Sequence, residues 1–318
     1  MAMWSKSQLG IKAKELGFVR DAYEKVCRLT EVLTFFESDD LLGRVLALKG
    51  GTAINLTVFN LPRLSVDIDL DFTEDVCRDE MMKSRSQIDD RIIKYMQAYG
   101  YSLSPKSKYH HALDSYVFDY MNSGGAKDNI KIEINYMLRC HIFPTEQNQF
   151  TSMWDQKTIQ VLSVDSIELF VSKIVALLNR IAARDIYDIY NLTKADLFDE
   201  SGKSLLRKSV VYYSAITSES QPREFDLGRM NEITQNQIRR ELYPVLRNSE
   251  KFDYQSSVAQ IKLWLTDLLA PEEDEWAFLN CFRENRYQPE LLFDDPEILN
   301  RIKNHPMALW KTQRLQQE

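Results

Sequence analysis

Three aspartates recur on alternate residues of one short segment. From Ser65 to Phe72 polar and apolar residues alternate strictly, which places Asp67, Asp69 and Asp71 on one face of a predicted strand. A half-buried strand explains the apolar face, but it does not explain like charges spaced about 7 Å apart. Carboxylate oxygens suit a hard divalent cation such as Mg²⁺. The segment therefore predicts a metal-binding strand, with a structural acidic strand or a calcium site as the alternatives.

A glycine turn lies shortly before this strand. Gly50 and Gly51 follow the apolar run 45–48, and glycines there permit a tight turn and close backbone approach to a ligand. The next segment, 52–59, is predicted to open a helix with Thr52 near its N-cap. Backbone N–H groups at a helix start favour phosphate oxygens. A Gly-Gly turn alone is usually an ordinary loop, but ahead of an acidic strand it predicts a nucleotide site.

A lysine helix follows much later in the chain. Asp165 or Ser166 can cap a helix whose broad apolar stripe is interrupted by Lys173. On the residues alone, that lysine is predicted to extend its amine to solvent along the apolar surface. Asp185 and Asp188 lie three apart, hence on the same face of a helix. Asp185 suits the cap of that helix equally well.

These segments together resemble a known family. The residues are Lys49-Gly50-Gly51-Thr52-Ala53, then Arg63-Leu64-Ser65-Val66-Asp67-Ile68-Asp69-Leu70, and later Lys173 to Asp188. They resemble the motifs of the AbiEii/AbiGii-type toxins, in the DNA polymerase β-like nucleotidyltransferase superfamily. The resemblance covers roughly residues 44 to 192. Many superfamily members have Gly-Ser at the turn, whereas Gly-Gly-Thr is usual in the AbiEii-like group.

The resemblance implies roles for particular residues. Asp67 and Asp69 are expected to be catalytic and to bind one or two Mg²⁺ ions, with Glu133 as a third metal ligand from a neighbouring strand. The alternative for Glu133 is an ion pair with Lys131 on the same strand face. The residues expected to bind the nucleotide are Gly50, Gly51, Thr52 and Lys173. Lys173 is also expected to be catalytic. Asp185 is the first candidate for a further catalytic acid and Asp188 the second. Arg63 and Ser65 either hold the turn and strand or touch the nucleotide, and Asp71 is expected outside the metal shell.

The implied activity is transfer of a nucleoside monophosphate from an NTP to an acceptor hydroxyl. The resemblance implies a toxin of a toxin–antitoxin or phage-defence pair, with tRNA as acceptor and a cognate antitoxin as partner. Three alternatives remain open: a small-molecule acceptor, a protein acceptor, and a catalytically idle nucleotide-binding module. A deep closed pocket would favour the small molecule, and an open groove would favour RNA.

The predicted fold class is α+β, with a small mixed sheet flanked by helices and a mainly helical C-terminal half. Residues 1–160 are predicted to form the nucleotidyltransferase core, and residues 161–318 a helical domain that completes the active site. Helices are expected at 11–37, 75–98, 202–218, 229–241, 255–269 and 272–285. Strands are expected at 101–106, 114–120 and 129–138, besides the two around the glycine turn.

Charge and composition set wider bounds. The 318 residues carry a formal net charge of −7, and residues 271–300 alone hold nine acids against two arginines. Residues 201–251 hold nine bases against six acids, which either line an RNA-contacting groove or form solvated helix faces. The four cysteines are far apart and predict free thiols in a reducing compartment. No signal peptide or membrane span is expected, so a cytoplasmic location is predicted.

Overall fold

The computed structural model describes residues 4–218 and 225–314, which form two compact units. The first unit comprises the chain up to Arg139, then Thr145–Val164 and Tyr243–Glu250. The second comprises Cys140–Pro144, Asp165–Leu242 and the chain from Lys251 onward. Neither unit is therefore a continuous stretch of sequence. None of the helices in the described ranges combines the length and apolar composition needed to cross a bilayer.

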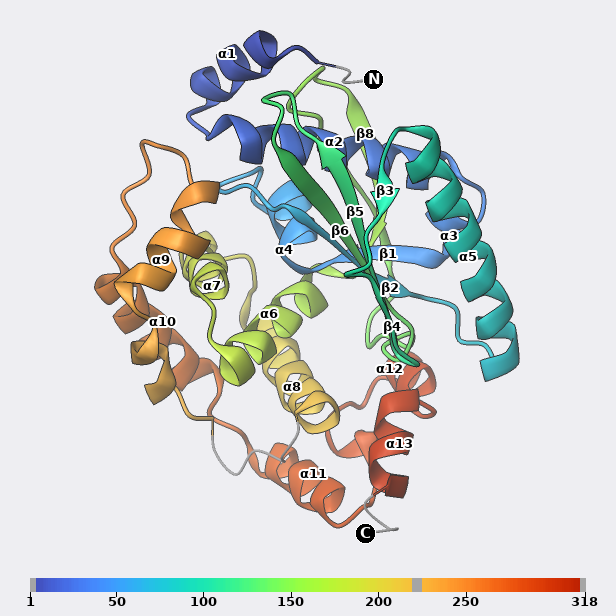
Figure 1. The fold of residues 1–318 in the computed structure, drawn as a ribbon. Helices are drawn as coiled ribbons and strands as arrows, with labels where there is room; N and C mark the ends of the chain where they lie inside the picture. The colour runs from blue at the N-terminus through green and yellow to red at the C-terminus, as the bar shows by residue number, and fades with distance from the viewer. Residues whose placement is uncertain (1–3, 219–224, 315–318) are drawn as a thin grey trace. The chain divides into compact units, whose positions relative to one another are not determined.

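A mixed sheet is the framework of the first unit (Figure 1). Its strands run in the spatial order β3-β5-β6-β2-β1-β8-β7, and β4 pairs with β5. The pairs β2–β6 and β1–β8 are parallel, and the other pairs are antiparallel. The strands are β1 Leu46–Lys49, β2 Asp67–Phe72, β3 Ser102–Leu103, β4 Lys108–Tyr109, β5 Leu113–Met121, β6 Lys127–Asn135, β7 Glu146–Thr151 and β8 Thr158–Ser163.

Alternation of apolar residues explains why the two central strands form. Ile68, Leu70 and Phe72 of β2 are all buried, as are the isoleucines at 130, 132 and 134 of β6. The alternate positions between these apolar residues are occupied by the aspartates of β2 and, in β6, by Glu133 among others. One face of the central sheet is thus part of the hydrophobic core, and the opposite face presents the polar residues. The predicted mixed α+β fold is confirmed, with a sheet larger than expected.

The helices of the first unit are α1 Lys6–Leu16, α2 Arg20–Ser38, α3 Leu42–Val45, α4 Gly50–Ala53, a π-helical segment Ile54–Val58, and α5 Arg78–Ala98. The single helix expected at 11–37 was wrong, because the chain breaks at Gly17. That glycine adopts φ 77°, and the N–H of Phe18 turns back to the carbonyl of Ala13 at 2.8 Å. A left-handed glycine ends a helix in this way even where the apolar spacing continues beyond it.

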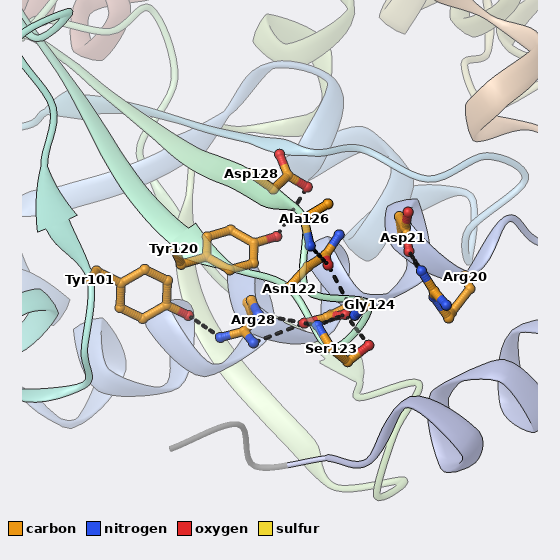
Figure 2. Close-up of polar contacts among 11 residues, drawn as sticks. Arg20, Asp21, Arg28, Tyr101, Tyr120, Asn122, Ser123, Gly124, Ala126 and Asp128 are labelled. Carbon is orange, nitrogen blue, oxygen red and sulfur yellow. Dashed lines mark hydrogen bonds and ion pairs between the residues drawn. The ribbon is translucent and has the colours of Figure 1, made fainter.

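A buried polar cluster joins α2 to the turn between β5 and β6 (Figure 2). Glu24, which is fully buried, accepts hydrogen bonds from the backbone N–H and the hydroxyl of Ser123. Arg28 donates to Glu24 at 2.8 Å and lies over the ring of Tyr120 at 4.3 Å. These contacts satisfy the buried charges and fix the hairpin that carries β6 against the helix.

The second unit is helical in its described parts. Its helices are α6 Ser166–Arg180, α7 Ala183–Ala195, α8 Glu200–Thr217, α9 Gln235–Glu241, α10 Tyr254–Leu268, α11 Glu273–Arg283, α12 Pro296–Ile302 and α13 Pro306–Arg314. The buried ring of Tyr212 on α8 contacts Phe278 and Phe293 at the core of this unit. The predicted helices at 202–218, 255–269 and 272–285 correspond to α8, α10 and α11, whereas that at 229–241 is a 3₁₀ turn followed by α9.

Candidate active site

The acidic strand β2 lies directly beside β6 in the sheet. Their parallel register pairs Asp67 with Lys131 and Asp69 with Glu133. Residues paired in this way project from the same side of a sheet, on strands about 4.8 Å apart. Asp67, Asp69 and Glu133 therefore share one face. Of the residues predicted to bind metal, all three belong to the first unit and to adjacent strands.

Glu133 already has a cationic partner on its own strand. Its carboxylate lies 2.8 Å from the ammonium of Lys131, and both side chains are partly exposed. Within the ranges that the structure describes, no group of three or more histidine, cysteine or acidic side chains is gathered closely enough to hold a metal. The alternative pairing expected for Glu133 is thus present. Its role as a metal ligand stays a prediction.

Asp71 is neutralised by a residue to which the sequence analysis gave no role. Asp71 is buried, and its carboxylate lies 2.5 Å from the ammonium of Lys49 at the end of β1. The antiparallel pairing of β1 with β2 explains the contact, because Lys49 lies opposite Asp69. No signal in the sequence could have revealed this pair, because alternation within a strand does not show which strand lies beside it. Asp71 lies near the end of β2, where its ion pair joins β2 to Lys49 just before the glycine turn. Its place outside the metal shell stays a prediction.

The glycine turn touches the acidic strand. Gly50 has φ +66°, a conformation that residues with a Cβ rarely adopt. A Cβ built on Gly50 would lie only 2.6 Å from Oδ2 of Asp69. The missing side chain therefore makes room for that carboxylate against the backbone. The turn and the strand, predicted separately from sequence, form one local structure.

Thr52 holds this structure together from inside. Thr52 lies near the N-cap as expected, although the helix begins at Gly50, with Lys49 as its N-cap. Thr52 is buried, its hydroxyl donates to the backbone oxygen of Asp67, and it lies 2.8 Å from the hydroxyl of Ser65. Its side chain is engaged within the protein, so a ligand would meet the backbone of this turn.

Arg63 is also a structural residue. It is one of the largest fully buried side chains, and its guanidinium donates to the carbonyl of Leu64 at 2.9 Å. Its backbone forms an isolated β-bridge with Leu246, from a segment far along the chain. Of the two roles left open by the motif, the structure places Arg63 and Ser65 in contacts that hold the turn and the strand.

A second cluster of charges lies in the second unit. Asp165 caps α6 by accepting a hydrogen bond from the N–H of Ile167 at 2.7 Å, as expected. Lys173 does not extend to solvent but is buried, and its ammonium lies 3.0 Å from Asp185 and 3.1 Å from Asp188. The pairing of α6 with α7 thus depends on a lysine enclosed by two acids.

Asp185 does not cap its helix. The N-cap of α7 is Ala182, and the Asp185 carboxylate instead faces Lys173 and the guanidinium of Arg180 at 3.0 Å. Burial raises the pKa of Asp185, but the charge of Lys173 and the hydrogen bond from Arg180 prevail and hold it below its ordinary value. Asp185 is therefore ionised at neutral pH, which suits an acid that orients a lysine.

Comparison with known proteins shows which family the chain belongs to. The sequence profile of a family described as the nucleotidyl transferase AbiEii toxin of type IV toxin–antitoxin systems matches residues 34–268. The chain belongs to this family. It is accordingly a nucleotidyltransferase and a toxin of a type IV toxin–antitoxin system. Membership of this family implies an NTP substrate and an antitoxin partner.

A solved structure shares the fold. The chain is similar to MenT4, a nucleotidyltransferase toxin from Mycobacterium tuberculosis, with a TM-score of 0.66 and 13% sequence identity. The match covers 96% of this chain and 99% of that one. At this identity the likeness concerns the fold. No curated protein sequence matches the chain.

Proposed function

We propose that the chain transfers a nucleoside monophosphate from an NTP to a hydroxyl of tRNA, in a reaction that depends on Mg²⁺. The observation that carries this proposal is the contact between the Gly50 turn and the carboxylate of Asp69. A turn whose backbone N–H groups suit phosphate oxygens here adjoins an acid that suits a divalent cation. Nucleotidyl transfer needs both at one place, because the cation and the triphosphate must meet.

The residues present fit a divalent cation in kind, and the register of β2 with β6 puts them on one face of the sheet. Asp67 and Asp69 would hold it, and Glu133 would join them from the neighbouring strand, with the cation replacing Lys131 as its counter-charge. When bound, such an ion neutralises charge on the phosphates and activates the attacking hydroxyl. The three side chains offer oxygen ligands alone, which favours Mg²⁺ over a softer metal.

The remaining candidates bind and orient the nucleotide. In this proposal the backbone of Gly50, Gly51 and Thr52 cradles the phosphates, and the ammonium of Lys173 neutralises them. Asp185 holds Lys173 in place, which is the role that its ion pair supports. Asp188 shares that role through its own contact with Lys173. Catalysis then rests on positioning and charge neutralisation, as in other phosphoryl transfers.

The acceptor and the setting belong to the same proposal. tRNA is favoured over a small molecule or a protein because the family is one of toxins and because residues 201–251 are mildly basic. Residues 219–224 of that segment lie outside the described residues. A cytoplasmic location and a part in phage defence go with this setting.

Incubation with radiolabelled NTPs tests the proposal. The protein would be mixed with total cellular RNA, Mg²⁺ and each NTP labelled at its α-phosphate, beside the variants Asp69→Asn and Asp119→Asn. Asp119 pairs with Lys127 at the surface of β5 and serves as the charge-matched control. We expect label in a tRNA-sized band from the native and Asp119→Asn proteins and none from Asp69→Asn. Metal-dependent NTP binding without label in RNA would contradict the tRNA acceptor, and equal labelling by all three proteins would contradict the role of Asp69.

A further inference from the structure

A cavity lies in the first unit, away from the acidic strand. It has a volume of about 850 Å³, is open to solvent on one side, and is lined by residues of α2, α5 and the β7–β8 hairpin together with Trp4 and Gln8. None of its lining residues belongs to the Gly50 turn, to β2 or to β6. A volume of this order is typical of sites for small molecules and much exceeds that of one protein side chain.

Aromatic rings form much of its lining. Phe35 and Tyr95 stack with their ring centroids 3.8 Å apart, and Tyr99 continues this wall at 4.5 Å from Tyr95. On the hairpin side, Trp4 and Trp154 meet edge to face at 5.5 Å. The faces of such rings carry negative electrostatic potential and attract cations.

One carboxylate oxygen in this cavity lacks a hydrogen-bond donor among the described residues. The Oε1 atom of Glu31 is buried and accepts no hydrogen bond within the described part of the chain. The nearest cation along α2, Arg28, is one turn away and donates instead to Glu24 and to Tyr101 (Figure 2). A buried carboxylate oxygen without a donor destabilises the fold, and a ligand that donates a hydrogen bond to it would remove that cost.

The other charges of the cavity do not compensate Glu31. Glu37 and Asp155 also line it, and the one lysine among the lining residues, Lys157, already contacts Asp155 at 3.0 Å. Burial raises the pKa of Glu31 to about 7, which Arg28 opposes and Asp155 reinforces. The ionisable or charged groups around it are Cys27 and Arg28 on α2, Tyr95 and Tyr99 on α5, and Asp155 and Lys157 on the hairpin turn.

We propose that this cavity binds a small organic cation, an amine or guanidinium with a short apolar body. Its charged group would pair with Glu31, and the apolar body would lie against the rings of Tyr95 and Trp154. The excess of acids excludes a phosphate or nucleotide from this place, and so separates it from the NTP site. The volume favours a free small molecule over a single lysine or arginine side chain from another protein.

Tryptophan fluorescence and calorimetry test the proposal on the whole 318-residue chain. Because Trp4 and Trp154 line the cavity, agmatine should change their emission, whereas the uncharged n-pentanol should bind at least tenfold more weakly. Glu31→Gln keeps the shape and removes the charge, and should weaken agmatine binding about tenfold. Asp21→Asn removes one charge from the same helix outside the cavity and should leave the affinity within about twofold of the native value.

The affinity of the cavity for the cation should increase with pH. The cation binds to the ionised carboxylate, so affinity should rise as pH increases from 6 to 8 through the pKa of Glu31, which is about 7. Glu31→Gln should remove this rise while its thermal unfolding still shows a folded protein. Equal binding of agmatine to native and Glu31→Gln proteins, or no binding of agmatine at millimolar concentration, would overturn the proposal. Binding of an arginine-rich peptide but not of agmatine would equally overturn it, in favour of a protein side chain.

Discussion

The lack of a side chain at Gly50 allows the turn both to adopt a positive φ and to lie against the carboxylate of Asp69. In Gly50→Ala the new Cβ would lie 2.6 Å from Oδ2 of Asp69 and the backbone would keep its positive φ. We expect a loss of stability of about 1–3 kcal/mol from strain and displacement of the carboxylate. Nucleotidyl transfer should fall more than tenfold, because Asp69 must move. Urea denaturation and the labelling assay measure the two effects separately.

Gly100 supplies the matched control for that residue. It also has positive φ, at 82°, but a Cβ there would meet nothing within 4 Å. Gly100→Ala should therefore show the backbone strain alone, about 1 kcal/mol, with transfer unchanged. If both substitutions lowered transfer equally, the contact with Asp69 would have no part in activity.

At the scale of elements, the packing of α6 on α7 places the ammonium of Lys173 between the buried carboxylates of Asp185 and Asp188. Lys173→Met leaves Asp185 and Asp188 buried without their shared cation, although Arg180 still contacts Asp185. We expect a loss of about 3–5 kcal/mol in the free energy of unfolding, measured by urea denaturation. The side chain of Arg180 is 66% exposed, so Arg180→Gln should lower the free energy of unfolding by less than about 1 kcal/mol.

A double variant separates the structural role of Lys173 from its proposed contact with phosphate. Lys173→Met with Asp188→Asn removes one of the two acids together with the cation, and should recover part of the lost stability. Transfer activity should stay low in the double variant if Lys173 neutralises the nucleotide. Recovery of activity in step with stability would show that the lysine serves the packing of the helices only.

The elements that sequence predicted well are those whose signals are local. Strict alternation located β2 and β6, apolar spacing located α5, and the prolines between segments delimited α8 and α10. The β7–β8 hairpin was not predicted, because Glu146–Thr151 reads Glu-Gln-Asn-Gln-Phe-Thr and only Phe150 and Asn148 are even partly shielded. Its pairing with β8 supplies the order that its own residues lack. The cavity beside this hairpin could not be predicted either, because the sequence did not indicate the hairpin whose residues line it.

For the candidate site, spacing predicted which residues share a face, but not their partners. The shared faces of Asp67 with Asp69 and of Asp185 with Asp188 followed from the periods of strand and helix. The pairs Lys49–Asp71 and Lys173–Asp188 join residues far apart in sequence and depend on how elements pack. Sequence periodicity carries no information about such neighbours.

At the scale of the molecule, the units are discontinuous, and one short segment makes the first unit depend on the distant chain. Within Tyr243–Glu250, the N–H of Asn248 donates to the carbonyl of Gly17 at 2.6 Å. Arg247 donates to the carbonyl of Leu16 at 2.7 Å, and its guanidinium lies 4.6 Å from the ring centre of Phe18. The segment thus fastens the break between α1 and α2, and through the bridge between Leu246 and Arg63 it also holds the chain just before β2.

Arg247→Ala should therefore loosen the first unit at a place far from residue 247 in sequence. We expect a loss of about 1–3 kcal/mol, because a charge-assisted hydrogen bond and a cation–π contact are removed together. Amide hydrogen exchange should rise in α1, at the 16–19 turn and around Leu64, whose N–H donates to Val245 at 2.8 Å. Exchange in α8 and α11 should stay at native rates, since both belong to the second unit. The exposed Arg239 of α9 provides the control Arg239→Ala, for which no region should change. Faster exchange spread evenly over both units would mean that the segment stabilises the whole chain, and not the first unit in particular.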